Sequence, residues 1–184
     1  MRTFVAIELP KELTSKIDQL QSALKKTKAD VSWVKPQNVH ITLKFLGEVK
    51  EDKIEEVYQA VEKSAVGIKK FQVSLQGLGG FPNLKRPRVI WVGVEKGKEI
   101  LSELSPRVEE QFSGIGFAKE NRAFTPHLTL GRVKSLKNLE SLATEINKTA
   151  FETADFEVQE VVVMKSTLLP TGAVYTPVKK VLLS

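Results

Sequence analysis

Apolar residues recur along this chain at two different spacings, which predicts an alternation of strands and helices. Segments in which every second residue is apolar are typical of half-buried strands, whereas apolar residues three and four positions apart mark one face of a helix. Leu13, Ile17, Leu20 and Leu24 show the helical spacing. In the first half of the chain the pattern predicts strands at 2–9, 38–46 and 71–77, and helices at 11–27 and 51–66.

The second half of the chain repeats this order of elements. Its pattern predicts strands at 88–95, 125–133 and 155–165, helices at 100–112 and 136–148, and a final strand at 174–183. Pro106 falls inside the first of these helices, which should be kinked or restarted there. Matching apolar positions are separated by 85 residues: Ile54, Val57 and Val61 correspond to Leu139, Leu142 and Ile146, and Phe71 and Val73 to Phe156 and Val158.

Equal order and equal spacing predict an α+β fold with two similar β-α-β-α-β lobes related by a pseudo-twofold axis. We expect one bilobal domain over residues 1–184, with repeats at about 1–80 and 86–170 and the strand 174–183 closing the chain. Its mainly antiparallel sheets are expected to face a central cleft. We expect the stretch 77–83, which contains glycine and proline, to form the connection between the lobes or a loop at their rim.

Composition narrows the possible functions. The 184 residues include no cysteine, which excludes disulfides, thiol catalysis and cysteine-based zinc sites. Lysine and arginine outnumber acidic residues by 28 to 22, and the resulting net charge of +6 suits a phosphate-rich partner such as RNA. No apolar run is long enough to span a bilayer, and the N-terminus lacks the features of a signal peptide. We therefore expect a cytoplasmic protein without a membrane partner.

The only two histidines lie at equivalent places in the predicted repeats. His40 and His127 each begin a His-x-Thr-Leu segment inside a strand, 87 residues apart. Residues two apart on a strand point to the same face and lie about 7 Å apart, so each strand presents an imidazole together with the hydroxyl of Thr42 or Thr129. A lone histidine on a strand is more often structural, but two at equivalent positions predict a shared site in the cleft between the lobes.

Two imidazoles are suited to opening a cyclic phosphodiester. One can remove a proton from the attacking water while the other supplies a proton to the departing ribose oxygen, because an imidazole pKa lies near neutrality. The threonine hydroxyls can donate to the non-bridging oxygens. A zinc site is a poor alternative, since two histidines and no cysteine leave three protein ligands hard to assemble. We expect neither a metal nor a cofactor, and the residues alone do not decide which histidine is the acid.

Three further residues near these segments are candidates for substrate contacts. Strict alternation places Arg132 on the face opposite the second histidine, so it reaches the phosphate only if Gly131 hosts a bulge or ends the strand; otherwise it is a surface cation. Lys44 shares the face of the first histidine and is either an electrostatic aid or a solvated charge. Phe45 corresponds to Arg132 in the first repeat and either stacks on a base or fills the core.

The two His-x-Thr-Leu segments resemble the signature of the 2H phosphoesterase superfamily, and especially its RNA 2′,3′-cyclic phosphodiesterases, also called 2′-5′ RNA ligases. The likeness covers nearly the whole chain and includes Arg2–Leu9, Gly80–Pro82, Arg88–Trp91, Pro126–Arg132 and Ser166–Tyr175. It implies a bilobal α+β fold and metal-free hydrolysis of terminal RNA 2′,3′-cyclic phosphates to 2′-phosphates, with water as nucleophile and the 3′ oxygen leaving. It also implies the reverse joining of tRNA halves.

By this resemblance His40 is the proton donor, His127 is the acceptor, and Thr42, Thr129 and Arg132 contact the phosphate. Two alternatives stay open. Ligation, rather than hydrolysis, could be the physiological direction, and a non-catalytic module that binds RNA or a nucleotide could keep the same lobes. The expected partners are RNA, including tRNA or RNA fragments with cyclic phosphate ends, or nucleotides, and the expected protein is a monomer.

Overall fold

The predicted alternation of strands and helices is present in the computed structural model, which describes residues 1–184. The strands are β1 (Arg2–Glu8), β2 (Val31–Trp33), β3 (His40–Glu48), β4 (Phe71–Val73), β5 (Leu75–Phe81), β6 (Val89–Val94), β7 (His127–Val133), β8 (Phe156–Val158), β9 (Glu160–Leu169) and β10 (Gly172–Leu182). The α-helices are α1 (Thr14–Lys25), α2 (Ile54–Ser64), α3 (Lys98–Ser113) and α4 (Leu139–Lys148). Short 3₁₀ helices are η1 (Lys11–Leu13), η2 (Pro36–Asn38) and η3 (Glu51–Lys53). None of the helices combines the length and apolar character that a membrane crossing requires.

Two local predictions need correction. The stretch 77–83 is not a loop throughout, because β5 continues to Phe81 and pairs with β6. Glycine is needed at Gly79, since an added Cβ would lie 2.2 Å from the ring of Trp91 on β6. The helix α3 runs through Pro106 without restarting. The short β2 was not predicted, because three residues are too few to show alternation.

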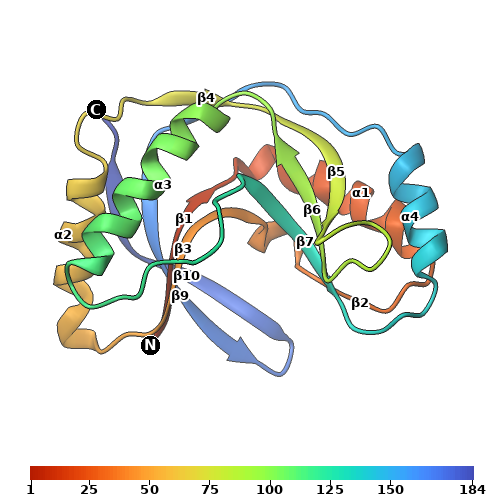
Figure 1. Cartoon of the computed structure of the whole chain (residues 1–184), viewed down its shortest axis with the longest axis horizontal. Helices are drawn as coiled ribbons and strands as arrows, with labels where there is room; N and C mark the ends of the chain where they lie inside the picture. Colours follow the sequence, from red (N-terminus) through yellow and green to blue (C-terminus); the bar gives the residue numbers. More distant parts are fainter.

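The strands form two antiparallel groups that meet at β3 and β7 (Figure 1). The order along the sheet is β10-β9-β1-β3-β7-β6-β5, with β2 pairing with β7. Between β3 and β7 a single registered pair, Ile41 with Leu128, connects the groups, and we call it the junction pair. A separate two-stranded sheet of β4 and β8 connects the two halves of the chain a second time. The expectation of mainly antiparallel sheets is confirmed.

At each of the two connections, the paired residues occupy equivalent positions in the two predicted repeats. The junction pair joins Ile41 to Leu128, 87 residues later, which is also the separation of the two histidines. In the β4–β8 sheet, Gln72 pairs with Glu157, 85 residues later. Two equivalent residues face each other in an antiparallel pair only where a twofold axis passes between them. The pseudo-twofold axis therefore runs through both connections.

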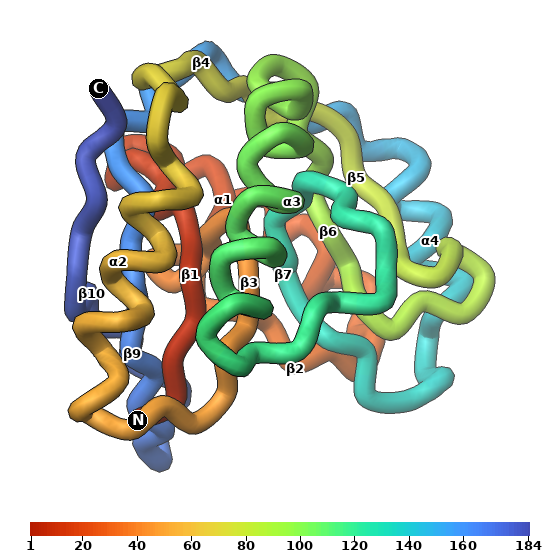
Figure 2. Tube along the Cα trace, turned by 60° about the vertical axis from the view of Figure 1, so that its left-hand side comes forward, coloured from red at the N-terminus to blue at the C-terminus, as the bar shows by residue number.

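Each lobe is built from both halves of the chain. The strand β9 of the second half pairs with β1, and β5 of the first half pairs with β6. The first lobe therefore contains β1, β3, β9 and β10, which α2 and α3 cover, and the second lobe contains β2, β5, β6 and β7, which α1 and α4 cover (Figures 1 and 2). The expected bilobal α+β fold is confirmed, with an exchange of elements between the repeats.

One face of the sheet is buried under the helices, and we call the opposite face, which lies toward the expected cleft, the cleft side. A continuous core of 37 buried residues, which includes Val5, Ile7 and the junction pair, lies on the helix side. On the cleft side the first lobe has a separate cluster formed by Phe4, Ala6, Val162 and Met164, against which Tyr175 packs. We call these four residues the cleft-face cluster. Alternation along β1 thus sends Phe4 toward the cleft and Val5 into the core.

Candidate active site

Both histidines lie beside the junction pair, at the first residues of β3 and β7. The junction pair is fully buried in the core, so alternation turns its neighbours, His40 and Thr42 on β3 and His127 and Thr129 on β7, to the cleft side. The antiparallel register runs His40 toward Thr129 and Thr42 toward His127. The structure therefore brings the two predicted imidazoles and the two predicted hydroxyls to one face of the sheet where the lobes meet.

The ring of His40 is held by hydrogen bonds and by stacking. Its Nδ1 lies 2.7 Å from the carbonyl oxygen of Asn38, and its Nε2 lies 2.7 Å from Oγ1 of Thr42. The ring stacks on Phe4 with 4.8 Å between centroids, and Tyr175 meets it edge-on at 5.4 Å. Because a carbonyl only accepts, Nδ1 carries the proton of the neutral ring, and Nε2 accepts from the Thr42 hydroxyl.

The ring of His127 repeats this arrangement in the second lobe. Its Nδ1 lies 2.6 Å from the carbonyl oxygen of Thr125, again two residues earlier in the chain. Phe81 meets the ring edge-on at 4.9 Å and packs on Trp91 at 5.3 Å. The carbonyl fixes the proton on Nδ1, as it does in the first lobe. In both neutral imidazoles Nε2 is therefore the nitrogen without a proton, and it is the one that can accept or transfer one.

The surroundings lower the pKa of both imidazoles. For His40 the main cause is burial, which disfavours the charged ring, and the hydrogen bond to the Asn38 carbonyl raises the pKa in part. Burial also lowers the pKa of His127; the bond to the Thr125 carbonyl raises it, and the positive charge of Arg132 lowers it. The free protein therefore favours neutral rings at neutral pH, and an imidazolium formed here is a stronger acid than usual.

A β-bulge in β7 brings Arg132 to the cleft side. In the pairing with β6, Leu130 has no partner, so the alternation is reset between Leu130 and Gly131. Arg132 then shares the face of His127 instead of the opposite face. Its positive charge acts on both His127 and Tyr175, which come from different lobes. The condition stated for a cleft position of Arg132, a bulge beside Gly131, is thus met.

An equivalent bulge in β3 makes the prediction for Lys44 wrong. In the pairing with β1, Leu43 and Leu46 have no partner, and Leu43 lies three positions after the histidine, as Leu130 does in β7. The bulge turns Lys44 to the helix side, where its Nζ donates to the carboxylate of Glu109 at 2.8 and 3.0 Å and to the carbonyl of Ala118 at 2.9 Å. Lys44 is therefore neither on the face of the histidine nor solvated.

The same bulge places Phe45 on the cleft side. The ring is 66% exposed and lies 6.2 Å from the ring of Phe4. The alternative in which Phe45 fills the core is therefore wrong, and stacking on a base stays a prediction. Phe45 and Arg132 occupy equivalent positions, each one residue past the site where the bulge resets the alternation.

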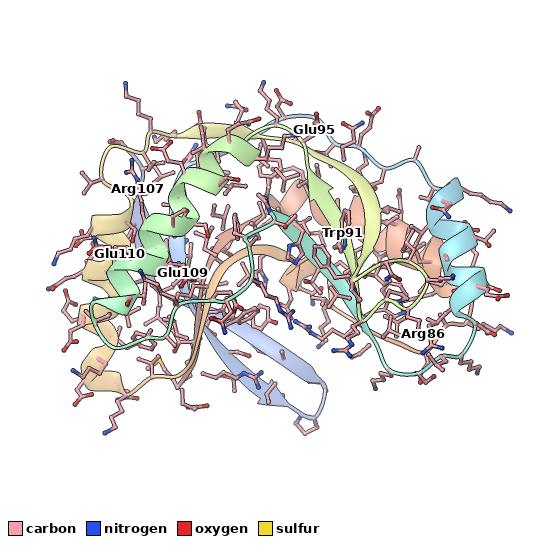
Figure 3. All side chains as sticks on the ribbon, in the orientation of Figure 1. Arg86, Trp91, Glu95, Arg107, Glu109 and Glu110 are labelled. Atoms are coloured by element: carbon pink, nitrogen blue, oxygen red, sulfur yellow. The ribbon has the colours of Figure 1, made fainter.

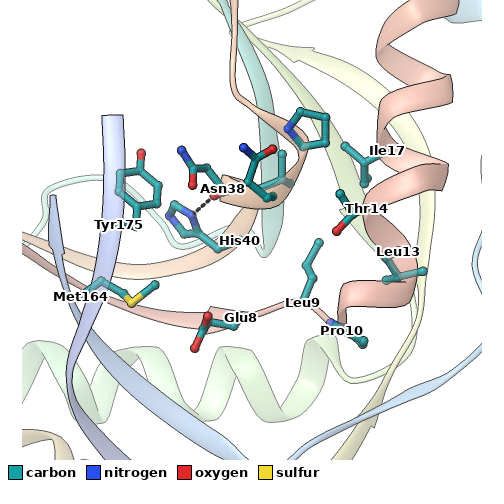
Figure 4. Close-up of a pocket in the computed structure, with 13 residues that line it drawn as sticks. Glu8, Leu9, Pro10, Leu13, Thr14, Ile17, Asn38, His40, Met164 and Tyr175 are labelled. Atoms are coloured by element: carbon teal, nitrogen blue, oxygen red, sulfur yellow. Dashed lines mark hydrogen bonds between the residues drawn. The ribbon is translucent and has the colours of Figure 1, made fainter. Parts of the chain in front are cut away.

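A pocket opens beside His40, as Figure 4 shows, with Asn38 and Tyr175 close to the imidazole. Its cavity of about 80 Å³ lies between η1, the start of α1, η2 and the β9–β10 hairpin. The side chain of Asn38 donates to the carbonyl of Ala173 at 2.9 Å and so ties η2 to this hairpin. Sequence reasoning did not single out Asn38 or Tyr175, because their places depend on contacts between segments far apart in the chain.

Nowhere do three His, Asp or Glu side chains gather as a metal site would need.

Each lobe contributes a histidine and a threonine to one face of the sheet, and Arg132 lies on the same face. These groups suit the chemistry of a phosphoesterase. The chain matches the family described as LigT like Phosphoesterase twice, over residues 7–91 and 92–175, and it belongs to this family. The two matches agree with the duplicated order of elements. The predicted family and the predicted enzyme class, a phosphoesterase, are therefore confirmed.

Relatives of known name resemble the chain over nearly its full length. An RNA 2′,3′-cyclic phosphodiesterase of Methanothermobacter thermautotrophicus is 38% identical, over 96% of this chain and 95% of the relative. One of Methanocaldococcus jannaschii is 36% identical, over 98% and 99%. Among solved structures, that of E. coli LigT complexed with 3′-AMP has a TM-score of 0.80 and 26% identity, over 100% of this chain and 98% of that chain.

Proposed function

We propose that this chain hydrolyses the 2′,3′-cyclic phosphate at an RNA end to a 2′-phosphate, without a metal, by acid-base catalysis from His40 and His127. The junction pair carries the proposal, because it brings the two histidine strands together with both imidazoles on one face. The matching hydrogen bonds from Nδ1 to a carbonyl support it further. The names of the relatives support RNA as the substrate, and the LigT complex with 3′-AMP supports a nucleotide as ligand.

The neighbouring groups favour His127 as the base and His40 as the acid. The positive charge of Arg132 favours the neutral form of His127, which is the form that can accept a proton from water. As the oxygen of that water attacks phosphorus, the bond to the 3′ oxygen breaks and protonated His40 donates Nε2–H to the leaving oxygen. The product is a 2′-phosphate with a free 3′-hydroxyl. Proton exchange with solvent returns both rings to their starting states.

Arg132, Thr42 and Thr129 are proposed to bind the phosphate during this step. Negative charge accumulates on the non-bridging oxygens as water attacks, and a guanidinium with two hydroxyl donors stabilises it most at that point. Thr42 has a second role, because its hydroxyl is hydrogen-bonded to Nε2 of His40 at 2.7 Å. Once His40 is protonated, Nε2 no longer accepts this bond, so the Thr42 hydroxyl hydrogen becomes available to the phosphate while Nε2–H is given to the leaving oxygen.

The test is incubation of the protein with a nucleoside 2′,3′-cyclic phosphate in the presence of EDTA, with the product identified by phosphorus NMR. We expect the 2′-phosphate, and we expect His40→Ala and His127→Ala each to lower kcat about 10²–10⁴-fold, as removal of an acid-base catalyst does. Circular dichroism and thermal unfolding confirm that each variant is folded. A 3′-phosphate product, activity abolished by EDTA, or a folded His→Ala variant with wild-type turnover would contradict the proposal.

A further inference from the structure

Three hydrogen-bond donors form a row across the cleft side of the first lobe. In the pairing of β1 with β9, Arg2 faces Ser166, and in the pairing of β9 with β10, Ser166 faces Tyr175. The register between β1 and β9 is regular, and two residues further along both strands the paired side chains belong to the cleft-face cluster. The row therefore lies on the same face as this cluster, with neighbouring strands about 5 Å apart.

The cation in this row has no anionic partner. Arg2 is exposed and forms no ion pair with any carboxylate of the chain. Glu48, which faces it on β3, lies instead 3.3 Å from the N-terminal amine. Burial raises the pKa of the Tyr175 hydroxyl, whereas the positive charges of Arg132 and Arg2 lower it. Tyr175 therefore lies within the electrostatic reach of two guanidinium groups.

The row begins beside His40 and leads away from it along the sheet. Tyr175 meets the ring of His40 edge-on at 5.4 Å, so only the other end of the row lies in the next layer. There the ring of Phe4, which stacks on His40 and meets Tyr175 edge-on at 4.9 Å between centroids, lies between the histidine and Arg2. Strand rise places Arg2 about 7 Å beyond Phe4. The cyclic phosphate carries one negative charge, for which Arg132 already supplies a guanidinium beside His127. A second unpaired guanidinium in the next layer, next to two hydroxyl groups, has the composition of a second phosphate site.

We propose that Arg2, Ser166 and Tyr175 bind the phosphodiester on the 5′ side of the terminal nucleotide. The inference rests on the proposed function, because it places this second phosphate relative to the cyclic end. Arg2 supplies the charge, and the two hydroxyls donate to the remaining oxygens of the phosphodiester. A mononucleotide with a 5′-hydroxyl lacks this group and leaves the row empty. The site therefore selects the end of an RNA strand over a free nucleoside 2′,3′-cyclic phosphate.

Three substrates with the same terminal base test this selection. They are adenosine 2′,3′-cyclic phosphate, the dinucleotide that carries a second adenosine on its 5′ side, and the same dinucleotide with an uncharged methylphosphonate linkage. For the wild type, we expect kcat/KM to be about tenfold higher for the charged dinucleotide than for either of the others, as a charge-assisted contact implies. The methylphosphonate keeps the second base, so it separates the charge from base stacking.

Variants of Arg2 test whether this residue binds the charged phosphodiester. Arg2→Gln should lower the ratio of kcat/KM between the two dinucleotides about tenfold, with partial recovery in Arg2→Lys. The salt dependence of kcat/KM for the charged dinucleotide should also fall by about 0.7 in log-log slope, which a merely structural defect would not change selectively. Arg107→Gln is the control, because this arginine lies on α3, outside the cleft, and pairs with Glu103 (Figure 3).

The outcomes separate the two proposals. If the wild type cleaves all three substrates with similar kcat/KM, or if Arg2→Gln lowers all three equally, the second phosphate site is wrong while the hydrolytic function stands. If the wild type cleaves none of them, the proposed function itself fails. A ratio that falls as much in Arg107→Gln as in Arg2→Gln would also overturn the assignment, because the effect would then follow net charge and not position.

Discussion

Each histidine of the candidate site is fixed by a carbonyl two residues earlier in the chain, and the two rings differ in their other neighbouring groups. Asn38 and Thr125 supply the carbonyls, so both rings have the same tautomer. His40 has a hydroxyl against Nε2, whereas His127 has the positive charge of Arg132 nearby. The pseudo-twofold axis therefore relates the two positions without making them chemically equal, and this difference underlies our proposal that one ring acts as acid and the other as base.

The charge of Arg132 should be visible in the titration of a single residue. A nearby cation disfavours the imidazolium and lowers the pKa of His127, so Arg132→Gln removes that effect and the pKa rises. Arg132 is not among the causes that shift the pKa of His40, whose titration should stay in place. The measurement is a proton NMR titration of the imidazole C–H signals, which the chain simplifies because it has only two histidines.

His40, whose titration curve should not shift, serves as the internal control. A general change in fold or ionic conditions would shift both curves, whereas loss of one local charge shifts one. In the same variant, the limb of the pH profile of kcat/KM that reports on the base should move to higher pH, because His127 must lose its proton before it can accept another. Equal shifts of both histidines, or no shift of His127, would contradict the position given to Arg132.

At the scale of elements, the bulge that follows each histidine decides which nearby side chains enter the cleft. Each bulge follows its histidine by three residues, and each reverses the alternation that the earlier part of the strand sets. Phe45 and Arg132 consequently face the cleft, while Lys44 and Gly131 face the helix side. An added Cβ at Gly131 would lie 2.6 Å from the side chain of Val31, so β2 packs too closely there for any other residue.

The inward turn of Lys44 links β3 to the loop that precedes β7. Its ammonium pairs with Glu109, and this carboxylate also accepts the backbone N–H of Glu120 at 3.0 Å. The side chains of Lys44 and Glu109 are only 5% and 18% exposed. Lys44→Met would leave the carboxylate largely buried without its cation, and we expect the free energy of unfolding to fall by about 3 kcal/mol. Urea denaturation followed by circular dichroism measures this change.

Lys53→Met provides the matched control for the buried pair. Lys53 and Glu56 form an ion pair at the same 2.8 Å distance, but their side chains are 55% and 47% exposed. Removing such an exposed pair should cost less than about 1 kcal/mol. The double variant Lys44→Met with Glu109→Leu should recover much of the lost stability, because no unpaired buried charge remains. Equal losses in Lys44→Met and Lys53→Met would show that burial of the pair does not matter.

The order of elements was predictable from the sequence, but their partners and irregularities were not. Hydrophobic spacing is a local property, so strands such as β3 and helices such as α2 could be located from it. No local signal says that β5 pairs with β6 or that β9 pairs with β1. Bulges have no reliable local signal either. Gly131 indicated a possible bulge before Arg132, whereas Leu43 did not, and Lys44 was therefore assigned to the wrong face. The histidines could be found because they recur at equivalent positions in a duplicated pattern.

At the scale of the whole molecule, the exchange of strands and helices makes each half of the chain dependent on the other. Residues 1–86 contain β1 without its neighbour β9 and β5 without its neighbour β6. The helix α1 of this half packs in the second lobe, and α3 of the other half packs in the first (Figure 2). A half alone would expose the apolar sides of two incomplete sheets, since the 37-residue core continues through both lobes.

We therefore predict that fragments 1–86 and 87–184 do not fold separately but reassemble when they are mixed. The cut follows the exposed residues Lys85 and Arg86 in the loop between β5 and β6, at the rim marked by Arg86 in Figure 3, so it interrupts no strand. Each fragment carries one histidine, so neither can hydrolyse a cyclic phosphate by the two-histidine route, and activity regained on mixing measures reassembly directly. Circular dichroism and urea denaturation of the separate fragments complete the test. A fragment that unfolds cooperatively as a monomer would show that the repeats, and not the exchanged lobes, are the units of folding.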